Sequence, residues 1–173
     1  AISSKALQKI EYRGIDNSDS ISKKNFTFSH CLHSVVGNKP QPLENKNYIF
    51  ATNCEIYNWK QLKTKHKLKS QNDAELLFDL LNKEKLEEVL PQLDGVFAFV
   101  LHNKKTNITT LARDNLGVKP IWFHHKKYLL FASERKAIAT EKIDPEELNP
   151  RKIIKYNHKT KKITFLNQEF FKI

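Results

Sequence analysis

The stretch that decides the fold is Tyr48-Ile49-Phe50-Ala51-Thr52-Asn53-Cys54-Glu55-Ile56-Tyr57-Asn58, in which an apolar segment runs into a polar one. Residues 48–52 are β-branched or aromatic apart from Ala51, so they predict a buried strand. Asn53 is expected to end this strand in a turn, where its side-chain amide and the Cys54 N–H could converge on a developing oxyanion. Glu55 adds a carboxylate that could accept an ammonium group. An Asx-type turn that merely closes the strand is the simpler interpretation.

The composition indicates one globular domain with a sizeable core, since 39% of the 173 residues are hydrophobic. The chain contains no apolar run near the ~20 residues that a membrane span needs, and its first residues lack the layout of a signal peptide. We therefore expect a cytoplasmic protein without a membrane partner. Cys31 and Cys54 are too few for a disulfide framework and are expected to be free thiols.

The formal charge of +11 raises the question of a nucleic-acid partner. The lysine pairs fall at predicted turns, without interleaved aromatic residues, so solvated hairpin tips explain them better. The four glycines are far apart, which excludes a phosphate-binding loop. Cys31 and His33 have metal-ligand spacing, but a structural zinc site needs four ligands and no second cluster is evident, so we predict no metal site.

The order of predicted elements favours an α+β fold with helices that cover antiparallel sheets. An amphipathic helix opens the chain and ends near Gly14, and residues 15–25 are polar and predict a loop. Asn72-Asp73 precedes a leucine-rich helix, so Asp73 is either a helix cap or a ligand group that acts with Glu55. Most of the remaining chain predicts strands, over residues 96–102, 108–113, 119–123, 128–133, 153–157 and 163–166.

Seven collinear motifs together resemble the glutamine amidotransferase domain of the asparagine synthetase family. Each motif is weak alone, but their order and spacing are specific. The motifs are Arg13-Gly14-Ile15-Asp16, Gln41-Pro42-Leu43, Asn53-Cys54-Glu55-Ile56-Tyr57-Asn58, Asn72-Asp73-Ala74-Glu75, Gly95-Val96-Phe97-Ala98-Phe99, Arg113-Asp114-Asn115-Leu116-Gly117-Val118-Lys119-Pro120 and Ala132-Ser133-Glu134.

The resemblance implies that residues 1–173 form a single glutamine amidotransferase domain of the N-terminal-nucleophile class. This class has a four-layer αββα sandwich of two antiparallel sheets between helices. The implied reaction is attack of an N-terminal cysteine thiolate on the glutamine carboxamide, with release of ammonia. The resemblance assigns the oxyanion donors to Asn53 and Cys54, substrate binding to Leu32, His33, Ser34, Val35, Val36, Glu55 and Asp73, and support of the site to Arg13.

Three departures from the family pattern shape these expectations. The strand that carries the nucleophile is expected to precede the first helix, so we expect the chain as written to show no glutaminase activity. Leu32 stands where the family commonly has an arginine for the glutamine carboxylate, and His33 is only a weak substitute. Cys54 stands at a usual glycine position, where positive φ would cost a side chain ~1 to 2 kcal/mol.

The implied partners are glutamine and a synthetase domain or subunit, which amidates aspartate. The resemblance implies no cofactor in this domain, ATP and Mg²⁺ in the synthetase domain, and a dimeric enzyme as one form. Two alternatives from other classes stay open. The chain could be a catalytically dead homologue that binds an amino acid, or a basic interaction module, which would be retained on a polyanion column at physiological salt.

Overall fold

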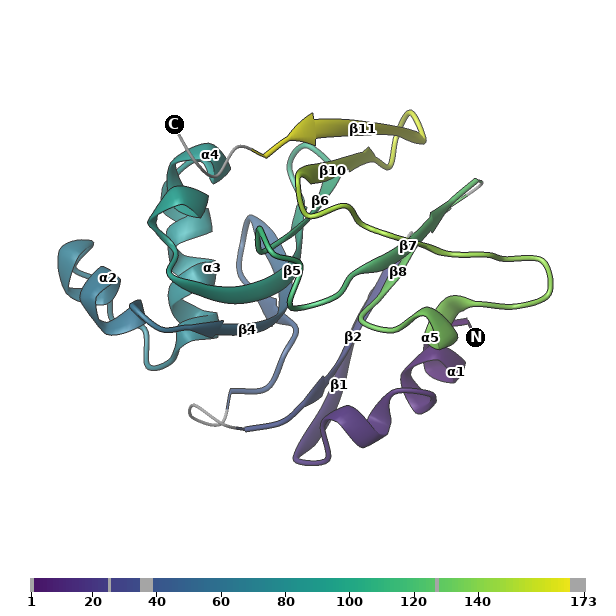
Figure 1. Cartoon of the computed structure of the whole chain (residues 1–173), viewed down its shortest axis with the longest axis horizontal. Helices are drawn as coiled ribbons and strands as arrows, with labels where there is room; N and C mark the ends of the chain where they lie inside the picture. The colour runs from purple at the N-terminus through teal and green to yellow at the C-terminus, as the bar shows by residue number, and fades with distance from the viewer. Residues whose placement is uncertain (1, 25, 35–38, 127, 169–173) are drawn as a thin grey trace.

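The computed structural model describes residues 2–24, 26–34, 39–126 and 128–168 and has the predicted α+β composition (Figure 1). The helices are α1 (Ile2–Gln8), η1 (Glu11–Arg13), α2 (Trp59–Lys65), α3 (Asp73–Lys83), α4 (Leu86–Val89), η2 (Leu90–Gln92) and α5 (Arg135–Ile138). The strands are β1 (Asn17–Lys23), β2 (Phe26–Leu32), β3 (Leu43–Glu44), β4 (Tyr48–Ile56), β5 (Gly95–Asn103), β6 (Ile108–Arg113), β7 (Trp122–His125), β8 (Leu129–Ala132), β9 (Glu146–Glu147), β10 (Lys152–Asn157) and β11 (Lys162–Asn167).

The elements stack in four layers, which confirms the predicted αββα sandwich. One antiparallel sheet has the order β11-β10-β6-β5-β4-β3, and α3 packs on one of its faces. The other face meets a divided layer made of the pair β1-β2 and the trio β8-β7-β9. Helices α1 and α5 contact β2 and β8 respectively, and contact each other, so they form the fourth layer (Figure 1).

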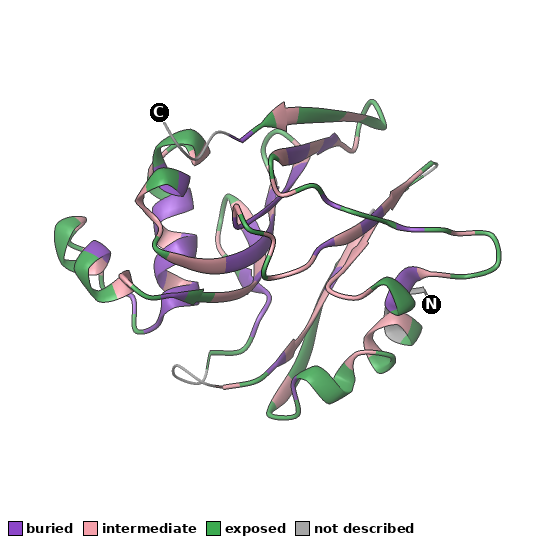
Figure 2. Cartoon of the chain, viewed as in Figure 1, coloured by how far each residue is buried: buried purple, intermediate pink, exposed green. Residues whose placement is uncertain are grey.

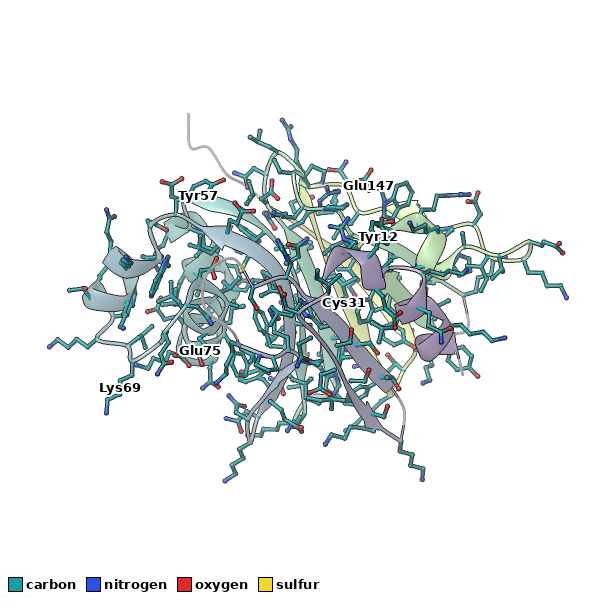
Figure 3. All side chains as sticks on the ribbon, turned by 90° about the horizontal axis from the view of Figure 1, so that it is seen from below. Tyr12, Cys31, Tyr57, Lys69, Glu75 and Glu147 are labelled. Atoms are coloured by element: carbon teal, nitrogen blue, oxygen red, sulfur yellow. The ribbon has the colours of Figure 1, made fainter. Side chains whose placement is uncertain are left out.

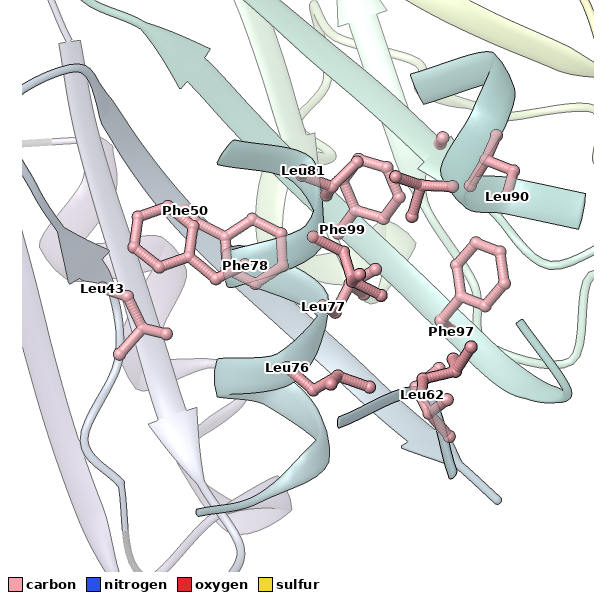
Figure 4. Packing of buried hydrophobic residues seen from close by; sticks show 14 of the residues in the cluster. Leu43, Phe50, Leu62, Leu76, Leu77, Phe78, Leu81, Leu90, Phe97 and Phe99 are labelled. Atoms are coloured by element: carbon pink, nitrogen blue, oxygen red, sulfur yellow. The ribbon is translucent and has the colours of Figure 1, made fainter. Parts of the chain in front are cut away.

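The larger core lies between α3 and the six-stranded sheet. Helix α3 begins after Asn72, whose side-chain oxygen accepts the Glu75 N–H at 2.8 Å. Its leucines and Phe78 recur at helical spacing and are buried, as the purple face of the helix shows in Figure 2. Phe78 stacks on Phe50 of β4 with ring centroids 5.3 Å apart (Figure 4). At the start of α3 the Asp73 carboxylate accepts the Ile56 N–H at 3.1 Å, which fixes this end of the helix at the end of β4.

Two sequence predictions of non-strand structure, a loop over residues 15–25 and a turn at Asn53, are wrong. The predicted loop over residues 15–25 contains β1, which pairs with β2 from Asn17↔Leu32 to Lys23↔Phe26. Its polar residues hid it because most of this edge strand is exposed. The predicted turn at Asn53 is also absent, because β4 continues to Ile56, which pairs with Gly95. Pairing with β5 therefore keeps β4 in an extended conformation through its polar residues Asn53, Cys54 and Glu55.

Candidate active site

The polar end of β4 presents its side chains to both faces of the sheet. Side chains alternate along a strand, so Asn53 and Glu55 share the face of Ile49, which belongs to the core between the two sheets. Cys54 lies on the opposite face and packs against the α3 core. Cys54 is not among the described residues with positive φ, so its side chain adds no backbone strain at the position where the family usually has glycine.

The backbone of Cys54 points away from β5. Cys54 is opposite Phe97, and the Phe97 N–H and C=O both bond to Asp114 on the far side of β5, at 3.3 and 2.7 Å. In an antiparallel ladder, two opposite residues either exchange both hydrogen bonds or exchange neither. Cys54 and Phe97 are therefore a non-hydrogen-bonded pair, and the Cys54 N–H is directed to the open edge of β4.

The two neighbouring N–H groups on this edge are already bound. Thr52 N–H donates to the Gln41 side-chain oxygen at 2.8 Å, and Ile56 N–H donates to Asp73 Oδ2 at 3.1 Å. Among the described residues, the Cys54 N–H between them has no acceptor, and the Asn53 amide makes no hydrogen bond. Both predicted oxyanion donors are thus free, although they lie on a strand edge rather than in a turn.

Asp73 is not the helix cap, because Asn72 fills that position. Asp73 is the first residue of α3; its carboxylate is buried and accepts the N–H groups of Ile56 and Ala74, at 3.1 and 2.9 Å. This contact fixes the carboxylate one residue beyond Glu55 along β4. The predicted pairing of Glu55 and Asp73 around one ammonium site stays a prediction.

Glu55 contacts a cation that the sequence analysis did not assign to the site. Lys119 Nζ lies 2.7 Å from Glu55 Oε1, and the two side chains are 20% and 49% exposed. Sequence alone could not pair residues that are 64 positions apart. The motif that carries Lys119 was nevertheless visible, and its first two residues explain how the lysine is placed.

Arg113 and Asp114 are buried and fold the loop that presents Lys119. The Asp114 carboxylate accepts the N–H groups of Val118 and Lys119 at 2.9 and 3.0 Å. The Arg113 guanidinium donates to the carbonyls of Gly117 and Lys119, and Gly117 adopts a φ of +68°, where a Cβ would meet Arg113. These bonds fix the Lys119 backbone and leave its side chain to extend toward β4.

A cavity of about 850 Å³ opens beside this edge, and Asn53, Cys54, Glu55, Asp73 and Lys119 all contribute to its lining. Its walls also include every residue of β2 and of β8. Among the described strands, β2 pairs only with β1 and β8 only with β7, so each turns an unpaired edge to the cavity. Phe28 and Phe131 meet across it with ring centroids 5.3 Å apart. The cavity is therefore a cleft between two open strand edges.

The remaining predicted site residues divide into those near the cleft and those that the structure leaves undescribed. Leu32, His33 and Arg13 line the cavity, whereas Ser34 is not part of its lining. Arg13 bonds to Glu134 at 2.8 Å. Val35 and Val36 lie outside the described residues. Asp16, which sequence reasoning did not assign, accepts the Ser34 N–H at 2.7 Å and holds the segment that follows β2.

The two thiols are free and differently placed. Burial raises the pKa of the Cys54 thiol well above its ordinary value, and the neighbouring Asp73 carboxylate raises it further, so this thiol stays protonated and is a poor nucleophile. Cys31 Sγ accepts a hydrogen bond from Ser18 at 3.6 Å. Among residues that the structure describes, no group of three or more His, Cys, Asp or Glu side chains is placed to hold a metal ion.

The basic side chains surround the molecule rather than gathering on one face. Figure 3 shows nitrogen-tipped side chains around the outline of the molecule in this view, with Lys69 at the lower left. This distribution agrees with the predicted hairpin tips. No helix in the described part of the chain is long and apolar enough to cross a bilayer.

Comparison with known proteins gives a consistent result. A family model described as a glutamine amidotransferase domain matches residues 1–172. The glutamine-hydrolyzing asparagine synthetase 1 of Methanocaldococcus jannaschii is 38% identical over 122 residues, which are 66% of this chain and 22% of that protein. The glutamine-hydrolyzing asparagine synthetase 2 of Bacillus subtilis is 32% identical over 148 residues, 81% of this chain and 20% of that protein.

A solved structure supports the fold independently. The glutamine phosphoribosylpyrophosphate amidotransferase of B. subtilis, complexed with ADP and GMP, superposes with a TM-score of 0.79 at 16% identity. The match covers 96% of this chain and 46% of that one. At this identity the likeness concerns the fold alone.

Proposed function

The chain belongs to the glutamine amidotransferase domains of the asparagine synthetase family, and from this premise we propose that the open edge of β4 binds glutamine for hydrolysis. The observation that carries the proposal is the Cys54 N–H, which has no acceptor in the part of the chain that the structure describes and lies between two N–H groups that side chains have already bound. An N–H group left open beside a cleft can donate to a ligand oxygen. The neighbouring Asn53 amide supplies a second donor.

In the proposed complex, the carboxamide oxygen of glutamine accepts hydrogen bonds from the Asn53 side chain and the Cys54 N–H. Both donors strengthen as negative charge develops on that oxygen, and loss of one such donor typically costs ~10²- to 10³-fold in rate. Glu55 and Asp73 attract the α-ammonium group. Leu32 and His33, which line the cavity, border the substrate, and Arg13 supports this wall through its bond to Glu134.

The proposed nucleophile is a thiolate on an extended segment that enters the cleft between β2 and β8. Its sulfur attacks the carboxamide carbon, the C–N bond breaks, and the amine leaves as ammonia after taking up a proton. Water then cleaves the thioester, which releases glutamate and restores the thiol. Neither Cys54, with its protonated thiol, nor Cys31 is assigned this role.

The ammonia is proposed to serve a synthetase domain or subunit. This chain spans about a quarter or less of the relatives named above, which leaves room for such a domain in proteins of that kind. We propose that ATP and Mg²⁺ act in the synthetase part, with aspartate as acceptor, and that the reaction takes place in the cytoplasm. The two free cysteines support a reducing compartment.

Titration with L-glutamine tests the proposal on the chain itself. Calorimetry should detect binding, and NMR should show that the Cys54 backbone and Asn53 side-chain amide signals shift at saturation. Glu55→Gln should weaken binding about 10- to 100-fold, because it removes a charged hydrogen-bond acceptor. The exposed Glu141→Gln is the matched control and should bind like the wild type.

Two results would contradict the proposal. One is the absence of glutamine binding, and the other is binding that shifts neither amide signal. In a full-length protein that carries this domain, Glu55→Gln should raise KM for glutamine and leave ammonia-dependent synthesis unchanged. Equal loss of both activities would instead indicate a general defect in folding.

A further inference from the structure

The Glu55–Lys119 ion pair has an unusual position for a structural contact. Both side chains line the cleft, and the Glu55 carboxylate is the group proposed above to accept the substrate ammonium. An ion pair that is partly exposed to solvent contributes little to the free energy of unfolding, typically ~0 to 1 kcal/mol. The buried Arg113–Asp114 scaffold nevertheless positions the lysine, which suggests a requirement other than folding.

An α-amino acid brings two charges into the cleft, so its carboxylate needs a cation close to the site of its ammonium group. Leu32 supplies no charge there. Arg13 and Lys39 also line the cavity, but each is paired with a carboxylate that has no proposed role in binding, namely Glu134 at 2.8 Å and Glu75 at 2.8 Å. Lys161 lines the cavity as well, but among the described cations of the lining Lys119 alone is paired with Glu55, the carboxylate that the ligand itself would occupy.

We infer that Glu55 and Lys119 together form a receptor for the amino-acid zwitterion, an inference that rests on the proposed function. The α-ammonium of the substrate replaces Lys119 on Glu55, and the released Lys119 ammonium binds the α-carboxylate. The exchange leaves every charge paired. The flexible four-carbon stem of lysine permits this movement, while the bonds to Asp114 and Arg113 hold its backbone in place.

The inference predicts that removal of the Lys119 charge weakens the binding of one ligand and does not weaken that of another. Calorimetry would compare L-glutamine with 4-aminobutanamide, which has the same carboxamide and ammonium groups and lacks the α-carboxylate. Lys119→Met should weaken L-glutamine binding about 10- to 100-fold, because one charged hydrogen bond is lost. The same variant should bind 4-aminobutanamide as tightly as the wild type or more tightly, because Lys119 no longer competes for Glu55.

Two further variants separate charge from structure. Lys119→Arg keeps the cation and should retain most of the preference for L-glutamine. Lys39→Met removes another cavity lysine from an ion pair of similar length and should leave the preference unchanged. If Lys119→Met weakens both ligands equally, or if Lys39→Met abolishes the preference, the inference is wrong. Failure of the wild type to bind L-glutamine would overturn the proposed function itself and the inference with it.

Discussion

The two ends of the β4–β5 strand pair differ in their polar groups: one end has a buried histidine network and the other has a partly exposed ion pair. At one end Ile49 pairs with His102, and at the other Glu55 pairs with Val96, about 20 Å away along the strands. His102 is buried and bonds to Thr109 Oγ1 at 3.0 Å, and Thr109 Oγ1 lies 2.7 Å from His158. Burial, with the charges of His158 and Lys104, lowers the pKa of His102 to about 4.

The Glu55 end keeps its charges and leaves donors without partners. Glu55 is half-exposed, its partner Lys119 comes from a separate loop, and the Cys54 N–H beside them is open. At the His102 end, in contrast, the buried polar side chains of His102, Thr109 and His158 contact one another. The charge of Lys104 there is paired with Glu44 at 2.6 Å. The difference teaches that polarity alone does not mark a site in this fold. A site is marked by hydrogen-bonding capacity that the protein does not itself use.

The largest expected effect comes from removing the scaffold beneath the Glu55 end. Asp114→Ala would leave the buried N–H group of Phe97 and the partly buried N–H groups of Val118 and Lys119 without their carboxylate acceptor. The free energy of unfolding should fall by about 3 to 5 kcal/mol, as measured by urea denaturation. Asp144→Ala, at an exposed carboxylate paired with Arg135, should change it by less than about 0.5 kcal/mol. A loss below about 1 kcal/mol for Asp114→Ala would show that this end does not depend on its scaffold.

A smaller effect is expected at the His102 end, and it depends on pH. Because the pKa of His102 is about 4 in the folded state and about 6.5 in the unfolded state, the unfolded chain binds more protons between these values. Stability should therefore fall by about 2 to 3 kcal/mol as the pH drops from above 6.5 to 4. His102→Gln should remove this part of the pH dependence, as urea denaturation at each pH would measure.

The control for this prediction is His124→Gln, which removes a histidine from β7 instead. Carboxylates titrate in the lower part of the same range, so the informative quantity is the difference between each variant and the wild type. If His102→Gln leaves the slope of the free energy of unfolding against pH unchanged between pH 7 and 5, the folded protein does not hold His102 in its neutral form. The proposed contrast between the two ends would then fail.

The smallest effect should come from the ion pair at the Glu55 end. Glu55→Gln and Lys119→Met should each change the free energy of unfolding by less than about 1 kcal/mol, because the pair is partly exposed to solvent. A double-mutant cycle measured by thermal unfolding would give their coupling. A coupling of several kcal/mol would mean that the pair is structural, and would remove the contrast with the buried network at His102.

The sequence was most informative where periodicity and capping acted locally. The apolar run at Tyr48, the leucine periodicity of α3 and most of the alternating strands after Gly95 have signals within a few residues, and the structure confirms them. Strand β1 gave no such signal, because a solvated edge strand of serine, aspartate and lysine resembles a loop. The strand pairing that keeps Asn53 extended is also non-local.

The candidate site was predictable as a set of motifs but not as a set of contacts. Asn53, Glu55 and Asp73 were identified from the family pattern, and all three line one cavity. The roles of Gln41 and Lys119 depend on contacts with Thr52 and Glu55 across long chain separations. No spacing in the sequence encodes those distances, which explains why the ion pair and the covered N–H groups emerged only from the folded chain.

The cleft between β2 and β8 also has a consequence for self-association. An unpaired strand edge is a template on which other chains can aggregate, and proteins commonly cover or shorten such edges. Here both open edges line one cavity, and α1 and α5, which contact each other, pack on β2 and β8. A neighbouring molecule cannot add a flat sheet to either edge without entering lengthwise between them. The geometry of the cleft therefore also protects these two edges from edge-to-edge polymerisation.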